Sequence, residues 1–181
     1  MGLMRGSPSA RALTVFFILA LFRLAAEPAN IMVGDLTFTR PASWRWEAPQ
    51  PHSKAVNGFV IPDAASKSKV DVTFYIVNND IPTQRGILRS RFPEAQEADM
   101  HEQWLTIGKQ KILYFQIVGT FIYKEKAQPD QFWFEAVIPQ GKAYVYAQIH
   151  GPRVAAEREL GTFKKMVEDA IRTREAEKAA E

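Results

Sequence analysis

The sequence predicts an α/β (α+β) fold, in which an antiparallel β-sheet is accompanied by two helices. Several short segments alternate apolar and polar residues, as strands do when one face lies in the core. Turn residues separate the later segments so closely that consecutive strands must run antiparallel. Two other segments repeat apolar residues every three or four positions, which is the spacing of a helix with one buried face.

The N-terminus predicts a secretory signal peptide over residues 1–26. Arg5 and Arg11 supply a basic start, and the apolar run Ala12–Phe22 follows. That run is too short to span a bilayer, because a transmembrane helix needs about 20 apolar residues. The small residues that follow form the expected cleavage site, so we expect the mature chain to begin at Glu27.

An uncleaved anchor is the alternative. Residues 12–26 would then stay in the membrane, with Arg23 reaching toward the lipid headgroups. Membrane contact is expected only through this segment, if it is not cleaved. A thioether-linked lipid needs a cysteine, and the chain has none.

Charge argues against a nucleic-acid partner. The whole chain has 23 Lys and Arg residues against 20 Asp and Glu residues, a net charge of +3. The signal peptide contains three arginines and no acid, so the mature chain is neutral. Nucleic-acid phosphates are bound through a basic excess, and we therefore expect no nucleic-acid binding.

The mature chain has the length of one domain, expected at 27–171, followed by a polar C-terminal tail at 172–181. The expected strands are two short ones within 30–46 and single strands at 56–61, 70–77, 104–107, 112–121, 131–138 and 143–150. The expected loops are 48–54, 63–69, 94–100 and 124–130.

A mid-chain helix is expected to begin near Pro82. Proline suits the first turn of a helix, because the N–H that it lacks would be unpaired there. Ile81, Leu88 and Phe92 would share one face of this helix, and Pro93 would end it.

A second helix is expected from Val154 to about Glu177. Its apolar stripe comprises Leu160, Phe163, Val167 and Ile171. The residues after Arg172 are polar, and we expect them to be solvated and frayed.

Several short motifs resemble those of the PsbP-like family. The motifs are Pro41-x-x-Trp44 at the start of a strand, a mid-chain helix ending in Phe92, Gly119-Thr120-Phe121 in the central strand, Gly151-Pro152 after the last strand and Phe163 in the C-terminal helix. The resemblance covers about residues 34–171. It implies a single antiparallel sheet sandwiched by helices and, more narrowly, a small exported bacterial member of the family.

The mid-chain helix departs from the family pattern. Relatives often carry Arg-Trp and Gln-Phe pairs there, whereas this chain has residues 87–92, of which only Phe92 matches. Better-known members of the fold bind photosystem II or a nuclear-transport GTPase, and no residues here carry either binding site. The resemblance implies a non-catalytic exported module and does not name its partner.

The sequence contains no motif for catalysis, a metal or a cofactor. The start of a zinc-protease motif at His101-Glu102 lacks its second histidine, because Leu105 occupies that place. His52 and His150 are isolated, so no metal-ligand spacing exists. No serine has the flanking glycines of a nucleophile elbow. We expect no metal, no cofactor and no enzyme activity.

The last hairpin is the candidate binding surface. Tyr144, Tyr146 and His150 share one face of the final strand, and Trp133 and Glu135 share one face of the strand before it. If the register aligns these faces, the five side chains form one amphipathic patch of the kind that contacts ligands and proteins. We expect a partially exposed groove. The alternative is that the tyrosine rings simply cover the sheet.

A weaker candidate is an anion-binding cluster at Arg85, Arg89 and Arg91. Arg85 and Arg89 lie one helical turn apart and would present guanidinium groups to an anion. The alternative is a solvated helix face whose charge is neutralised by Glu94 and Glu97.

These features predict an exported, non-catalytic binding or accessory module of the cell envelope. Its partner would be an unknown envelope protein or a small ligand. The alternative is a small envelope hydrolase or isomerase with a pocket of dispersed polar residues. Buried titratable groups around one concave pocket would favour the enzyme.

Overall fold

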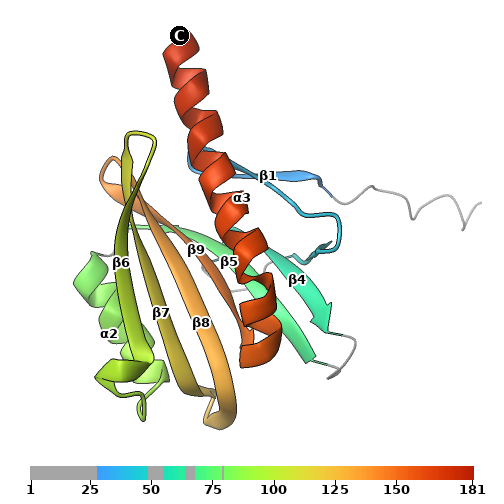
Figure 1. The fold of residues 1–181 in the computed structure, drawn as a ribbon, viewed down its shortest axis with the longest axis vertical. Coiled ribbons are helices and arrows are strands. Elements are labelled where there is room, and N and C mark those ends of the chain that lie inside the picture. The colour runs from blue at the N-terminus through green and yellow to red at the C-terminus, as the bar shows by residue number, and fades with distance from the viewer. Residues whose placement is uncertain (1–27, 49–54, 64–67, 79) are drawn as a thin grey trace, which may run out of the picture.

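In the described residues, two antiparallel sheets are accompanied by helices α2 and α3 (Figure 1). The computed structural model describes residues 28–48, 55–63, 68–78 and 80–181, so the expected signal peptide lies outside the described residues. The strands are β1 (Asn30–Val33), β2 (Leu36–Thr39), β3 (Arg45–Trp46), β4 (Asn57–Asp63), β5 (Ser68–Val77), β6 (Met100–Ile107), β7 (Gln110–Tyr123), β8 (Lys126–Gln140) and β9 (Ala143–Pro152). The helices are α2 (Ile81–Arg91), the short 3₁₀ helix η1 (Glu97–Asp99) and α3 (Arg153–Ala180).

The main sheet has seven strands in the order β3-β4-β5-β9-β8-β7-β6, and neighbouring strands are antiparallel. The predicted α+β class is confirmed. The prediction of a single sheet is wrong, because β1 and β2 pair only with each other. Gly34, at a φ of 63°, allows the tight turn that closes this separate hairpin.

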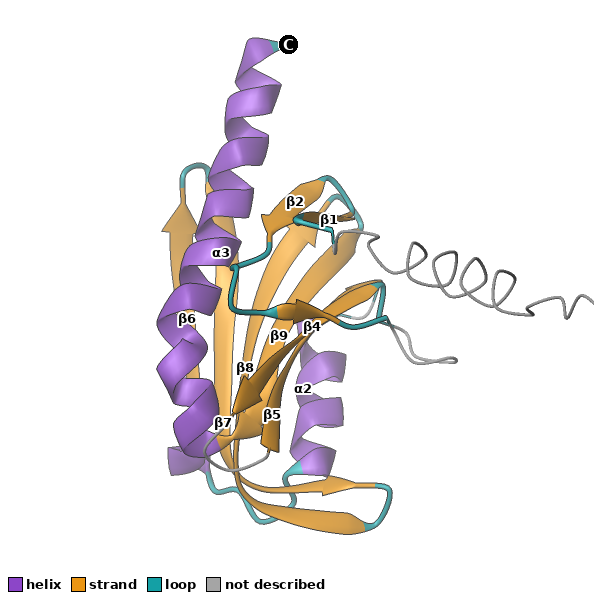
Figure 2. Ribbon diagram, turned by 90° about the vertical axis from the view of Figure 1, so that its right-hand side faces the viewer, coloured by secondary structure: helices purple, strands orange, loops and turns teal. Residues whose placement is uncertain are grey.

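The helices lie on opposite faces of the main sheet (Figure 2). Helix α3 and the β1–β2 hairpin cover one face, where Phe163 meets Phe134 edge-on with ring centroids 5.9 Å apart. Helix α2 covers part of the other face through Leu88 and Phe92, both buried. The expected helix face of α2 is confirmed. Its N-terminus is capped by Asp80, whose carboxylate accepts the Thr83 N–H at 2.8 Å.

Several strands are longer than the sequence predicts. Residues 124–130 were expected to form a loop, but only Lys124 and Glu125 turn, at φ values of 48° and 65°. Two left-handed residues make a tight hairpin turn, so strand pairing continues on both sides of it. Strand β6 begins at Met100 rather than at Trp104, because its exposed polar residues pair through the backbone at the sheet edge.

The C-terminal helix also continues beyond its expected end. It runs to Ala180, three residues past the expected end near Glu177, and extends past the end of the sheet (Figure 1). The expectation that the residues after Arg172 are frayed is therefore wrong. Its last turns contain Ala, Glu, Lys and Arg, which are good helix formers. Arg174 in this segment is buried. Over the described part of the chain, none of the helices has the length and apolar character needed to cross a membrane.

Candidate functional site

The register of the last hairpin aligns the two strand faces, which is the condition for the patch. Trp133 lies opposite His150, Glu135 opposite Gln148, and the partners of Tyr146 and Tyr144 are Val137 and Pro139. Directly opposed residues of an antiparallel pair share a face of the sheet. Trp133, Glu135, Tyr144, Tyr146 and His150 therefore lie on one face, as the sequence predicted.

The expected groove on that face is not formed. Trp133, Glu135 and Tyr146 are buried, with exposed fractions of 5%, 1% and 1%. Trp133 packs edge-on against Phe92 at the end of α2, with ring centroids 6.5 Å apart. Tyr144 and His150 are half-buried. The prediction of a partially exposed surface is wrong for the three buried residues, because α2 packs its own apolar face against this face of the sheet.

A chain of polar side chains crosses the buried part of this face. Gln84 of α2 donates through Nε2 to Glu135 Oε2 at 3.0 Å, and the Gln148 amide donates to the same oxygen. Thr73 Oγ1 donates to Gln148 Oε1 at 3.3 Å. The chain joins β5, β9, β8 and α2. Because every link is a buried or half-buried hydrogen bond, it fixes where α2 sits on the sheet.

Burial raises the pKa of Glu135 to about 7, and the hydrogen bonds from Gln148 and Gln84 oppose that rise. The Trp133 indole N–H also favours the ionised carboxylate slightly, although it falls short of hydrogen-bond geometry. A carboxyl with a pKa near 7 is suited to proton transfer.

The cavity beside Glu135 is very small. Its volume is about 10 Å³, and its walls include Gln84, Arg85, Leu88 and Tyr146. A cavity of this size holds roughly one water molecule. Glu135 therefore has a pKa suited to proton transfer, but the cavity beside it is too small for a substrate while α2 is in place.

His150 stacks on the Trp133 ring, with centroids 4.7 Å apart and planes 10° from parallel. Burial lowers the pKa of His150, Asp71 at 3.9 Å partly opposes this, and the positive charges of Arg91 and Lys69 add to it. The imidazole thus packs as an aromatic group against Trp133.

The three arginines of the predicted anion cluster each have their own neighbour. Arg85 pairs with Glu102, and Arg89 pairs with Glu97 at 2.7 Å. The Arg91 guanidinium lies 6.0 Å from the ring centroid of Phe121. Neutralisation of Arg89 by Glu97 agrees with the alternative weighed from the sequence. The charges of Arg85 and Arg89 are thus satisfied within the protein.

A larger cleft opens at the end of the sheet where α3 extends past it. We call it the terminal cleft; its volume is about 930 Å³. It is lined by Asp35, Lys109, Gln110, Pro139, Gln140, Gly141, Arg172, Arg174, Glu175, Ala176, Lys178 and Ala179. Sequence patterns do not predict this cleft, because its residues come from three hairpin turns and the end of α3.

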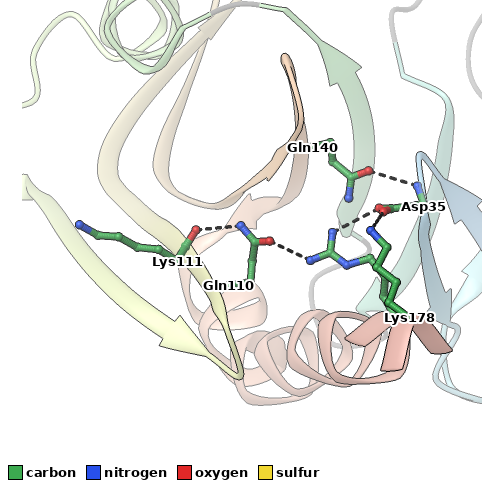
Figure 3. Close-up of polar contacts among 6 residues, drawn as sticks. Asp35, Gln110, Lys111, Gln140 and Lys178 are labelled. Carbon is green, nitrogen blue, oxygen red and sulfur yellow. Dashed lines mark hydrogen bonds and ion pairs between the residues drawn. The ribbon is translucent and has the colours of Figure 1, made fainter. Parts of the chain in front are cut away.

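Asp35 is the centre of the polar contacts in the terminal cleft (Figure 3). Its carboxylate accepts from Arg174 Nη1 at 3.2 Å and from Lys178 Nζ at 2.7 Å. Its backbone N–H donates to Gln140 Oε1 at 3.2 Å. Partial burial opposes ionisation of Asp35, but the Lys178, Gln140 and Arg174 side chains outweigh it and lower its pKa. Asp35 thus joins the β1–β2 hairpin to α3.

Arg174 is the buried cation of the terminal cleft. Only 8% of its side chain is exposed, and its Nη2 donates to Gln110 Oε1 at 2.9 Å. These two contacts use two of the five N–H donors of a guanidinium. The group has capacity for further hydrogen bonds to an acceptor in the cleft.

Glu175 closes the side of the terminal cleft formed by the β6–β7 turn. Its carboxylate accepts the backbone N–H of Lys109 at 2.7 Å and lies against Gly108. A Cβ added at Gly108 would stand 1.7 Å from Glu175 Oε2. A side chain at residue 108 would therefore displace the Glu175 carboxylate from its contact with the turn.

We expect Gly108→Ala to destabilise the protein by more than Gly141→Ala. Both glycines have φ values near 60°, at 58° and 62°, so alanine costs each about 1 kcal/mol. Nothing lies within 4 Å of a Cβ at Gly141, whereas at Gly108 the Glu175 contact must be lost as well, which adds about 0.5 kcal/mol. Urea denaturation measures both variants. Equal losses would show that Glu175 does not hold the turn.

The described ranges contain no group of three or more His, Asp or Glu side chains placed to hold a metal ion. The described residues thus define an α+β protein with a seven-stranded antiparallel main sheet between two helices, a separate two-stranded sheet, and a polar cleft at one end of the main sheet.

No family model matches the sequence, and no curated protein matches it. The chain is similar in structure to the cyanobacterial PsbP protein CyanoP from Synechocystis sp. PCC 6803, with a TM-score of 0.48 and 8% sequence identity. The superposition covers 79% of this chain and 92% of CyanoP. A similarity at this level does not assign a family, ligand or partner, so membership of the PsbP-like family stays a prediction.

Proposed function

We propose that the protein is an exported, non-catalytic binding or accessory module of the cell envelope that holds its ligand or partner in the terminal cleft. The observation that carries the proposal is the lining of that cleft. Four basic side chains, Lys109, Arg172, Arg174 and Lys178, stand against two acidic ones, Asp35 and Glu175. A volume of about 930 Å³ is in the range of small-molecule sites.

The binding role is supported by what the cleft residues do. The contacts around Asp35 and Glu175 tie α3 to two hairpin turns, so the cleft walls are held in place before anything binds. A preformed site loses less conformational entropy on binding. The polar side chains of the cleft donate hydrogen bonds or form ion pairs with one another. None of the described lining residues is a serine, threonine or histidine, so the cleft lacks a hydroxyl nucleophile with an adjacent histidine base.

One observation favours a second candidate, a small hydrolase or isomerase. Glu135 combines a pKa near 7 with a position beside Tyr146, whose own pKa is raised by burial and by the Glu135 charge. For a substrate to reach this carboxyl, α2 would have to move, because the adjoining cavity is about 10 Å³. We favour the binding module, since the terminal cleft needs no such movement.

Isolation of the protein from its native envelope tests the proposal. We expect mass spectrometry to find a chain beginning at Glu27, with a small molecule or partner retained under native conditions. A variant with Lys109→Glu and Arg172→Glu should lose what is retained. A matched variant with Lys124→Glu and Lys126→Glu in the β7–β8 turn, at the opposite end of the sheet, should keep it. Equal retention by all three proteins would exclude the terminal cleft as the site.

A further inference from the structure

We propose that the ligand of the terminal cleft is an oxyanion, that is, a carboxylate or phosphate group. The inference rests on the proposed function and specifies its ligand. It follows from a count of hydrogen-bond donors and acceptors in the cleft, taken with which of them are already engaged.

Three of the four carboxylate oxygens of the two acids in the terminal cleft accept hydrogen bonds. Both carboxylate oxygens of Asp35 accept hydrogen bonds, one from Arg174 and one from Lys178. Glu175 accepts the backbone N–H of Lys109. A cationic ligand would have to compete with these contacts for its counter-charge, and the remaining side chains offer it none.

Donors remain available in the same cleft. The side chains of Lys109 and Arg172 are exposed and make no ion pair with any described residue. Arg174 uses two of its five N–H donors. Gln140 Nε2 is buried without a hydrogen bond of good geometry. Charged donors bind the oxygens of a carboxylate or phosphate more strongly than they bind neutral acceptors.

Asp35 competes with such a ligand. Its carboxylate presents to Arg174 and Lys178 the same chemistry that an oxyanion would present. Removing the negative charge by Asp35→Asn leaves both cations able to turn to the ligand. We therefore expect that removing the charges of Lys109 and Arg172 weakens anion binding, whereas removing the charge of Asp35 strengthens it.

Titration of the full protein with inorganic phosphate tests the inference. Binding is measured by the change in backbone amide chemical shifts. We expect shifts at Lys109, Gln110, Gln140 and the end of α3. Lys109→Gln with Arg172→Gln should weaken phosphate binding by roughly tenfold, since two charged contacts are lost. Asp35→Asn should strengthen it several-fold. Lys124→Gln with Lys126→Gln removes the same charge at the opposite end of the molecule and should leave the affinity unchanged.

Two further arms identify the source of the oxyanion. Vesicles of phosphatidylglycerol and of phosphatidylcholine are compared by flotation with the wild-type protein and the same variants. Retention on phosphatidylglycerol alone, reversed by Lys109→Gln with Arg172→Gln, would identify a lipid headgroup. Binding of phosphate or acetate without vesicle retention would identify a free anion, and either result supports the inference.

The inference is overturned if phosphate and acetate leave the cleft amides unshifted and neither kind of vesicle retains the protein, or if the β7–β8 turn control loses as much affinity as the cleft variant. The proposed function would survive that result if a partner from the native envelope is still lost by the charge-reversed cleft variant. If the cleft variants lose neither anion binding nor the partner, both the inference and the proposed function are wrong.

Discussion

Replacing Glu135 by glutamine should raise the stability of the protein relative to wild type by roughly 2–3 kcal/mol more at about pH 8 than at about pH 5. The reason is the burial of this carboxyl, which raises its pKa from 4.5 to about 7 in the folded protein. Glutamine has the shape of the protonated acid, can accept from Gln84 and Gln148, and never ionises.

The direction follows from proton binding in the two states. Between about pH 4.5 and 7 the carboxyl ionises in the unfolded chain but keeps its proton in the folded one, so the folded state binds more protons. Stability contributed by this group is therefore full at low pH and is lost as pH rises to about 7. A pKa raised by 2.5 would correspond to about 3 kcal/mol in total, most of it lost within the range measured.

Urea denaturation of wild type and Glu135→Gln at the two pH values gives the result directly. Glu97→Gln is the matched control, because Glu97 is an exposed carboxylate paired with Arg89. Its difference from wild type should change by less than about 0.5 kcal/mol. If Glu135→Gln shows the same flat profile as Glu97→Gln, the buried carboxyl is ionised at both pH values and the polar chain under α2 is misassigned.

The sequence predicts those parts of the fold in which burial alternates with position. Strand β5 shows this alternation, with Val70, Val72 and Phe74 buried on the face toward α3. Strand β9 is buried on both faces, and its alternation of small apolar residues with tyrosines predicts it instead. The predicted bounds of both strands agree with the structure to within two residues. The N-terminal half of β6 was missed because His101, Glu102 and Gln103 are all exposed. An edge strand held by backbone pairing on one side leaves no apolar alternation to detect.

For the candidate sites, sequence patterns predict which residues share a strand face but not which elements pack against that face. Residue spacing predicts that Trp133 and Glu135 share one face of β8, because strand geometry is local, whereas the register with β9 brings Tyr146 to the same face. Whether a helix covers that face depends on the path from β5 through α2 to β6 at the far edge of the sheet, which no spacing reveals. The terminal cleft needs still more, since Asp35 and Arg174 are 139 positions apart and meet only when α3 continues beyond the expected domain end.

Asp35→Asn should destabilise the protein by about 2 kcal/mol, which is less than the 3–5 kcal/mol typical of breaking a fully buried pair because 43% of the Asp35 side chain is exposed. The substitution leaves the buried Arg174 guanidinium without its counter-charge. Lys178→Gln removes the other cation paired with Asp35, but that side chain is 60% exposed, so its loss should cost less than about 0.5 kcal/mol. Urea denaturation at neutral pH measures all variants.

A second substitution shows that the cost of Asp35→Asn comes from the stranded charge. Arg174→Met replaces the guanidinium by an uncharged chain of similar length, so the double variant should recover most of the stability that Asp35→Asn loses. Phosphate should also stabilise Asp35→Asn more than wild type, because an oxyanion in the terminal cleft takes the place of the missing carboxylate. If Asp35→Asn is as mild as Lys178→Gln, or if Arg174→Met adds its own full loss to the double variant, Asp35 does not neutralise Arg174 and the terminal cleft is not organised by this pair.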